Sequence, residues 1–246
     1  MSSKVITIAK RELRSYFDSL VAYVVVGGSM LGLGIWFFLM QQGGFWQIDR
    51  ASLGRMFDFL PWALSAMVLP LVTMRSLAEE KRTGTLELLI TMPVTDADVI
   101  LGKYLAALGL VAVLLLATFL YPVALFVFPW HLGALDWGPL VSGYVGTLLL
   151  SAAGLGVGLA FSAVSDSQIV AFFFTALTLI FLHVVGNVVE LVHGPVADVI
   201  SFVSFQTRFA PFARGLIDMR AVVYFLSVTA LSLLFAFRSL ESRKWN

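Results

Sequence analysis

The side chains that could carry out chemistry in this sequence are a serine and a histidine in apolar surroundings. Ser151 and His183 both lie in long apolar stretches, where a serine–histidine dyad could hydrolyse a peptide bond within a membrane. The segment LLLSAAGLG around Ser151 lacks the glycine two residues before the serine that the tight backbone of such a site requires. His183 and Asn187 are one helical turn apart, and we expect them to form a hydrogen-bonding pair between helices instead.

Metal and nucleotide chemistry lack their sequence motifs. His131, His183 and His193 do not have the spacing of zinc proteases, in which two histidines one turn apart flank a glutamate. The chain has no cysteine, so disulfides, thiolate metal sites and cysteine nucleophiles are excluded. No phosphate-binding G-x-x-x-x-G-K-[ST] loop occurs, and the net charge of +1 gives no support for nucleic-acid binding. We therefore expect no catalytic, cofactor-binding or metal-binding residue and no nucleic-acid partner.

Composition indicates the class of protein. Hydrophobic residues make up 59% of the chain and charged residues 13%, with a mean hydropathy of +0.93, whereas about 25% of residues in a soluble domain are charged. Apolar runs of about 20 residues predict an all-α polytopic membrane protein. Its six predicted transmembrane helices are Leu20–Met40, Phe59–Leu77, Val99–Phe128, Leu140–Val164, Ile169–Glu190 and Ala221–Leu240. They form a single transmembrane domain over residues 1–246 and leave no room for a soluble catalytic domain.

Lysine and arginine are distributed unequally between the two sides of these spans. Five of the 16 basic residues fall on one side, and the others fall on the side of the termini; the five are Arg50, Arg55, Arg208, Arg214 and Arg220. An excess of basic residues marks the cytoplasmic side of a membrane protein. We therefore predict that both termini and the loop between the second and third spans are cytoplasmic.

An amphipathic helix is predicted before the first span, over residues 1–19. Its apolar side chains recur at helical spacing, with polar residues on the opposite face; they are Val5, Ala9, Leu13, Phe17 and, at the start of the first span, Leu20. Such a helix lies in the membrane interface rather than crossing the membrane.

The segment Arg75–Lys103 is a charged interruption of an otherwise apolar sequence, and its loop covers residues 78–98. Glu79 and Glu80, with the two basic residues that follow, are strongly disfavoured in hydrocarbon. Thr83-Gly84-Thr85 predicts a turn and a helix cap, Leu86–Ile90 a short amphipathic helix, and Pro93 its end. A stiff helix between two spans could transmit force from a soluble partner. The alternative is a solvated connector whose charges only fix the topology.

Residues 191–220 form an external segment that is too apolar for a free loop. Aromatic and aliphatic residues are interrupted there by Gln206, Arg208, Pro211 and Arg214, which predicts one or two short helices. These helices are expected to dip into the outer leaflet or to cover the spans as a lid. Glu190, at the outer end of the fifth span, is a candidate residue of an outer gate.

Glycine and proline mark two features inside the spans. Gly154-x-x-x-Gly158 is a small-residue motif that predicts close packing between helices. Pro61 and Pro70 in the second span, and Pro122 in the third, are expected to kink their helices.

These features together resemble those of the type-2 ABC exporter permeases. The resemblance rests on Met74-Arg75-x-x-x-Glu79-Glu80-x-x-x-Gly84-Thr85-x-Glu87-Leu88-Leu89-x-Thr91-x-Pro93 and, in the C-terminal half, on Arg214-Gly215-Leu216-Ile217-Asp218 and Val223-Tyr224-Phe225-Leu226-Ser227. Within this class the chain is most similar to the permeases associated with gliding motility and with nitrous-oxide-reductase maturation.

The resemblance implies a permease subunit of a bacterial cytoplasmic membrane that forms a homodimer or heterodimer and pairs with two separate ATP-binding subunits. ATP and Mg would bind to those partners, and the complex would export a substrate or transmit force. Thr85–Met92 would be the coupling helix, and the contact with the partner would involve Glu79, Glu80, Gly84, Thr85, Glu87, Leu88, Leu89 and Pro93. Glu79 and Glu80 would contact either the partner or the N-terminal helix. The external segment would form the exit gate, with Glu190, Arg214 and Asp218 as its charged residues.

A six-span channel or secondary transporter without an ATPase partner is the alternative. Such proteins use charged residues at mid-depth in the membrane or inverted repeats. The first five predicted spans have almost no charge at mid-depth, and no repeat is visible. These observations favour the exporter permease.

Overall fold

The computed structural model describes residues 2–40, 54–84, 95–127, 135–191 and 193–242. All regular secondary structure in these ranges is helical. Six helices are long and apolar enough to cross a membrane, which confirms the predicted number of spans. Their bounds are Leu20–Leu39, Met56–Arg82, Asp96–Phe126, Trp137–Val164, Gln168–Val189 and Met219–Glu241.

The second span is longer than the sequence predicted. It continues past Leu77 to Arg82, with a turn at residues 74–77. The prediction ended this span before Glu79 and Glu80. Glu80 and Lys81 nevertheless belong to the helical segment, because both have polar partners inside the protein.

The helices follow one another along the chain without any strand in the described ranges. In order they are α1 (Ser2–Asp18), α2 (Leu20–Ile35), η1 (Trp36–Met40), α3 (Gly54–Ala63), η3 (Leu64–Val68), α4 (Leu69–Thr73), α5 (Ala78–Arg82), α7 (Asp96–Thr118), α8 (Leu120–Pro122), η4 (Val123–Val127), α9 (Trp137–Val164), α10 (Gln168–Val184), η5 (Val185–Leu191), α11 (Pro195–Val203), α12 (Phe205–Ala213) and α13 (Met219–Ser242).

Polar side chains determine where three of the long helices begin. Thr95 Oγ1 accepts a hydrogen bond from Asp98 N at 3.2 Å, and Asp98 Oδ2 accepts one from Thr95 N at 3.1 Å. This reciprocal pair satisfies two N–H groups at the start of α7. Ser19 and Asp136 accept hydrogen bonds from backbone N–H groups two residues later, at the starts of α2 and α9.

Prolines coincide with changes of helical register in the second and third spans. Pro61 lies inside α3 and is followed by the π-helical turn η3, and Pro122 is followed by the π-helical turn η4. Proline has no N–H, and its ring clashes with the preceding turn, so the helix accommodates an extra residue nearby. Pro70 lies in the first turn of α4, where its missing N–H is tolerated.

The helix α9 is at the centre of the bundle, and α4, α7, α10, α12 and α13 all pack against it. Its glycines allow this close approach. A Cβ atom at Gly158 would lie 2.1 Å from Thr73 Oγ1, and one at Gly154 would lie 2.5 Å from Leu69 Cδ1 and 3.4 Å from Leu179 Cδ1. The close packing predicted for Gly154-x-x-x-Gly158 is therefore confirmed.

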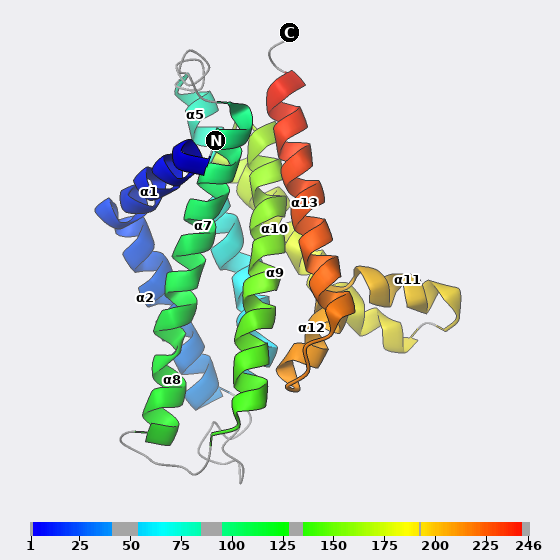
Figure 1. Ribbon diagram of the computed structural model, residues 1–246. Coiled ribbons are helices and arrows are strands. Elements are labelled where there is room, and N and C mark those ends of the chain that lie inside the picture. The colour runs from blue at the N-terminus through cyan, green and yellow to red at the C-terminus, as the bar shows by residue number, and fades with distance from the viewer. Residues whose placement is uncertain (1, 41–53, 85–94, 128–134, 192, 243–246) are drawn as a thin grey trace.

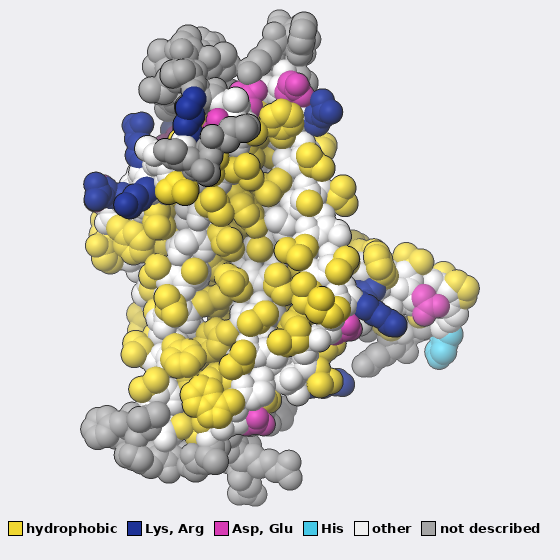
Figure 2. All heavy atoms as spheres, in the orientation of Figure 1, with side chains coloured by type: hydrophobic (Ala, Val, Ile, Leu, Met, Phe, Trp, Pro, Cys, Tyr) yellow, Lys and Arg dark blue, Asp and Glu magenta, His cyan; other side chains and the backbone are white. Residues whose placement is uncertain are grey.

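The start of α1 and the end of α13 lie at the same end of the bundle. Figure 1 shows α5 at this end as well. Figure 2 shows apolar side chains over the middle of the viewed face and many of the charged side chains at this end. We call it the charged end. The opposite end is the one at which α8 finishes and α9 begins.

The first helix, α1, packs across α7 near the charged end. A Cβ atom at Gly102 would lie 2.5 Å from Ile8 Cγ2, and one at Gly109 would lie 3.4 Å from Leu13 Cδ2. Leu13 belongs to the predicted apolar face of this helix, whereas Ile8 does not. The sequence therefore missed the side chain that makes the closest contact between α1 and α7 at these glycines.

The external segment contains two short helices that differ in burial. No residue of α11 is buried, and Figure 1 shows this helix projecting from the side of the bundle. In contrast, α12 buries Phe205, Phe209 and Phe212. Ser142 Oγ on α9 donates a hydrogen bond of 2.7 Å to the backbone oxygen of Phe212. The helix α12 is thus part of the packed bundle.

Candidate functional site

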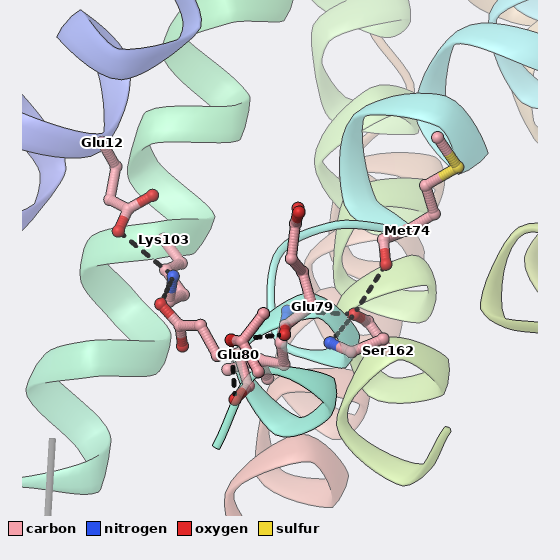
Figure 3. A network of polar contacts seen from close by, with 9 residues as sticks. Glu12, Met74, Glu79, Glu80, Lys103 and Ser162 are labelled. Carbon is pink, nitrogen blue, oxygen red and sulfur yellow. Dashed lines mark hydrogen bonds and ion pairs between the residues drawn. The ribbon is translucent and has the colours of Figure 1, made fainter. Parts of the chain in front are cut away.

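A buried lysine joins three helices at the charged end. Lys103 Nζ on α7 lies 2.7 Å from Glu80 Oε1 on α5 and 3.1 Å from Glu12 Oε1 on α1. Figure 3 shows both carboxylates pointing at the ammonium group. We call Glu12, Glu80 and Lys103 the charged junction. Because these residues come from distant parts of the sequence, the junction ties α1, α5 and α7 together.

Burial makes the charged junction expensive to break. The side chain of Lys103 is 5% exposed, that of Glu80 22% and that of Glu12 32%. A buried ammonium group without a carboxylate is very unfavourable, so Lys103 requires these partners. Removing one partner of a buried ion pair costs about 3–5 kcal/mol, whereas an exposed pair contributes about 0–1 kcal/mol.

A serine on α9 holds the start of α5. Ser162 Oγ accepts hydrogen bonds of 3.1 Å from the backbone N–H groups of Leu77 and Ala78. These are groups that a helix start leaves without a partner. Lys81 Nζ on α5 donates a hydrogen bond to the backbone oxygen of Ala163. The helix α5 is therefore fixed to the end of α9 as well as to α1 and α7.

A polar cavity of about 360 Å³ lies beside the charged junction. Side chains of α1, α2, α4, α5 and α7 and of the turn between α4 and α5 line it, including Tyr16, Arg75, Ser76 and Glu79. Burial raises the pKa of the Tyr16 hydroxyl above its ordinary value, so this group stays protonated at neutral pH. The site thus combines a tightly bonded ionic centre with space for polar groups.

Only part of the predicted coupling contact lies within the described residues. Glu80 is in the charged junction, and Glu79 lines the cavity. Gly84 has a φ of +72°, a left-handed conformation that favours glycine and agrees with the predicted turn. The other predicted contact residues lie outside the described residues; they are Thr85, Glu87, Leu88, Leu89 and Pro93.

Two of the three predicted gate residues, Arg214 and Asp218, have side chains within the described part of the structure. Arg214 is exposed at the end of α12. Asp218 Oδ1 accepts a hydrogen bond of 2.8 Å from Arg220 N and so caps the start of α13. Glu190 is part of η5, but its side chain lies outside the described part of the structure. The outer gate stays a prediction.

The candidate catalytic dyad is not formed. Ser151 Oγ and His183 Nδ1 are buried and have no hydrogen-bond partner in the part of the chain that the structure describes, so no base activates the serine. The pair predicted for His183 and Asn187 is wrong: the α-helix ends at Val184, and the tighter turn of η5 leaves Asn187 exposed. Within the described ranges, no cluster of His, Asp or Glu could hold a metal ion.

Sequence reasoning missed three residues that hold the site together, Glu12, Lys103 and Ser162. One signal was available for Lys103. It is the only charged residue in the predicted third span, and a lone lysine in an apolar helix requires a buried carboxylate partner. The sequence does not say which carboxylate that is, because Glu12 lies 91 residues away.

Comparison with known proteins gives a family match. The model described as "ABC-2 family transporter protein" matches residues 63–245, which is most of the chain and includes Glu80, Lys103 and Ser162. Glu12 precedes the matched region. A comparison with curated proteins gave no significant match.

Proposed function

Because the chain belongs to the ABC-2 transporter family, we propose that it is the permease subunit of an ATP-driven exporter. A separate ATP-binding subunit drives its conformational change by contacting residues 78–98. The family and the six apolar helices make the chain a multi-pass membrane transporter component rather than an enzyme. ABC-2 permeases in general have an ABC ATP-binding partner. The observation that carries the proposal is the charged junction, because it binds α5 immediately before the predicted coupling helix.

The proposed coupling proceeds through bonded helices. Closure of the ATP-binding subunits displaces the predicted coupling helix Thr85–Met92. The helix α5 lies next to it in the chain and is bonded to Lys103 and to Ser162. Displacement of α5 therefore moves α7, α1 and the end of α9 together, as packed helices slide in a domain movement. A solvated connector without such bonds absorbs the same displacement.

The proposed assembly is a dimer of permeases, homomeric or heteromeric, with two ATP-binding subunits that bind ATP and Mg. Three spans support a partner within the membrane, since they are the least buried of the six in this chain: Leu20–Leu39, Gln168–Val189 and Met219–Glu241. The resemblance to permeases of gliding motility and of nitrous-oxide-reductase maturation supports a bacterial cytoplasmic membrane as the location. Cargo leaves past the external segment, near Arg214 and Asp218.

The division of labour is tested by purifying the chain alone and together with its proposed ATP-binding subunit. The isolated chain should show no nucleotide binding by calorimetry, because it has no phosphate-binding loop. The complex in lipid should hydrolyse ATP. Saturable hydrolysis by the isolated chain would contradict the proposal.

The proposed orientation is tested with single introduced cysteines, since the natural chain has none. Both termini are cytoplasmic in the proposal, as the distribution of basic residues indicates. In intact cells, cysteines near Gly44 and Gly194 should react with an impermeant thiol reagent, whereas cysteines near Arg82 and Lys244 should not. Labelling near Arg82 would contradict the proposed orientation and place residues 78–98 outside the cell.

A further inference from the structure

Three buried side chains inside the bundle each have a polar atom without a hydrogen-bond partner in the described part of the chain. Ser65 on η3 and Ser151 on α9 are fully buried, and His183 on α10 is 6% exposed. The two hydroxyl oxygens and His183 Nδ1 have no hydrogen-bond partner among the residues that the structure describes. Buried polar groups in proteins are almost always bonded to protein or to ordered water, so each of these groups requires an explanation.

Three buried threonines in the spans find a partner within their own helix. Thr73, Thr147 and Thr175 each donate a hydrogen bond to the carbonyl four residues earlier, at 2.7–2.8 Å. A helix makes this carbonyl accessible to serine and threonine in general. The hydroxyls of Ser65 and Ser151 therefore point away from the carbonyls that would satisfy them.

Packing contacts put the two serines at the same depth. The second span touches α9 at one position before the two serines and at another after them. A Cβ atom at Gly143 would lie 2.6 Å from Phe57, and one at Gly154 would lie 2.5 Å from Leu69. Ser65 follows Phe57, and Ser151 follows Gly143, by the same number of residues. Because the two helices run in the same direction, equal steps along them reach the same level.

The histidine reaches this level from the fifth span. Leu179 lies at the same glycine contact as Leu69, at 3.4 Å from a Cβ atom at Gly154. The fifth span runs opposite to the second, and α10 packs against both α4 and η3. His183 lies one turn after Leu179, and Ser65 lies one turn before Leu69. Because the two spans run in opposite directions, His183 and Ser65 lie on the same side of the contact at Gly154.

We propose that Ser65, Ser151 and His183 form a buried binding site for an ordered water molecule. A buried water needs two to four polar partners, and the three side chains supply three from three different helices. Two hydroxyls and an imidazole suit a neutral ligand, whereas a hard cation such as Mg²⁺ or Ca²⁺ is held by carboxylate and carbonyl oxygens. Ser65 lies in the π-helical turn, a feature that often marks functional positions. The water links the second, fourth and fifth spans where the second span changes its helical register.

A double-mutant cycle on the thermal unfolding of the full chain in lipid nanodiscs tests this site. Ser65→Ala and Ser151→Ala should each lower the Tm by about 2–4 °C, because each removes one bond to the water. The double variant should lose less than the sum, since the two hydroxyls share one water. Thr175→Val is the matched control. Its hydroxyl has its own carbonyl, so its effect should add to that of Ser151→Ala.

Two outcomes of the cycle overturn the proposal. A higher Tm in the alanine variants identifies the hydroxyls as dry, unsatisfied groups. Additive losses exclude a shared ligand. A density map of the wild-type complex gives an independent test, with an expected peak within about 3.2 Å of polar atoms of at least two of the three side chains. Direct hydrogen bonds among the three without such a peak also overturn it.

Discussion

The two ends of the bundle are held together by different kinds of contact. At the charged end, ionic and polar bonds around Lys103 and Ser162 join α1, α5, α7 and α9. Towards the opposite end, large apolar side chains make close contacts beside neutral hydrogen bonds such as that from Ser142 to Phe212. A Cβ atom at Gly146 would lie 2.5 Å from Phe212, and the rings of Phe205 and Phe225 are 5.4 Å apart.

This difference separates the part of the molecule that receives movement from the part that accommodates it. Buried ion pairs have fixed partners and resist separation. Packed helices without such bonds can slide past one another by a small distance. A displacement of α5 is therefore carried by several helices as one unit at the charged end and is taken up by sliding deeper in the bundle.

Replacing Lys103 by methionine should break this comparison most severely. Lys103→Met leaves Glu12 and Glu80 close together without a cation, at a cost of about 3–5 kcal/mol. Transport per ATP hydrolysed in reconstituted vesicles should fall together with thermal stability. Arg238→Gln is the matched control, because it removes a cation from an exposed pair with Glu241 at 3.0 Å and should change stability by less than about 1 kcal/mol. Equal effects of the two substitutions would remove the distinction.

A triple variant separates stability from coupling at the charged junction. Adding Glu12→Gln and Glu80→Gln to Lys103→Met removes the uncompensated carboxylates and should restore much of the stability. The ionic link between α5 and α7 stays absent, so transport should remain low. Recovery of full transport would show that the ion pairs only stabilise the fold.

The close packing of α9 against the second span should not tolerate an added methyl group at Gly158. Gly158→Ala introduces a methyl group 2.1 Å from Thr73 Oγ1, and the β-branched threonine cannot easily rotate away. We expect a loss of about 1–3 kcal/mol in the free energy of unfolding, measured by thermal denaturation in lipid. A Cβ atom at Gly28 meets nothing within 4 Å, so Gly28→Ala should cause no loss. A similar loss in both variants contradicts the packing described here.

The smallest effect is expected for Glu12, which has the most exposed side chain of the charged junction. Glu12→Gln leaves Lys103 paired with Glu80 at 2.7 Å, so stability and transport should change little, by less than about 1 kcal/mol. Glu80→Gln should reduce transport more, because it removes the carboxylate of α5 itself. Thermal unfolding and vesicle transport measured on both variants decide which link carries the displacement. A larger effect at Glu12 would assign that role to α1.

The sequence predicted the spans well because hydropathy is a local property. Each apolar run predicts its own helix without knowledge of its neighbours, and the six runs match the six long helices. The small-residue motif on α9 was also predictable, since Gly154 and Gly158 lie on one face of a single helix. Local patterns do not determine which helix packs against that face.

The candidate site could be predicted only in part, because its bonds join distant residues. Glu80 was identified from the charged loop, but its partner Lys103 was not. The pairing depends on α7 and α5 lying side by side, which is a tertiary property. His183 shows the same limit in reverse. Its spacing to Asn187 predicted a pair, but the change from α-helix to a tighter turn after Val184 prevents it.

The proposed coupling depends on residues 78–98 receiving force from a separate ATP-binding subunit, and one copurification experiment tests this most directly. In the double variant Leu88→Asp and Leu89→Asp, two unpaired carboxylates replace the apolar side chains predicted to contact the partner. Association should weaken roughly a hundredfold or more, and the ATPase activity of the complex in lipid should fall with it. The six spans should still insert, because no residue within the bilayer changes. A double variant that binds its partner, hydrolyses ATP and transports like the wild type would show that this loop is only a connector.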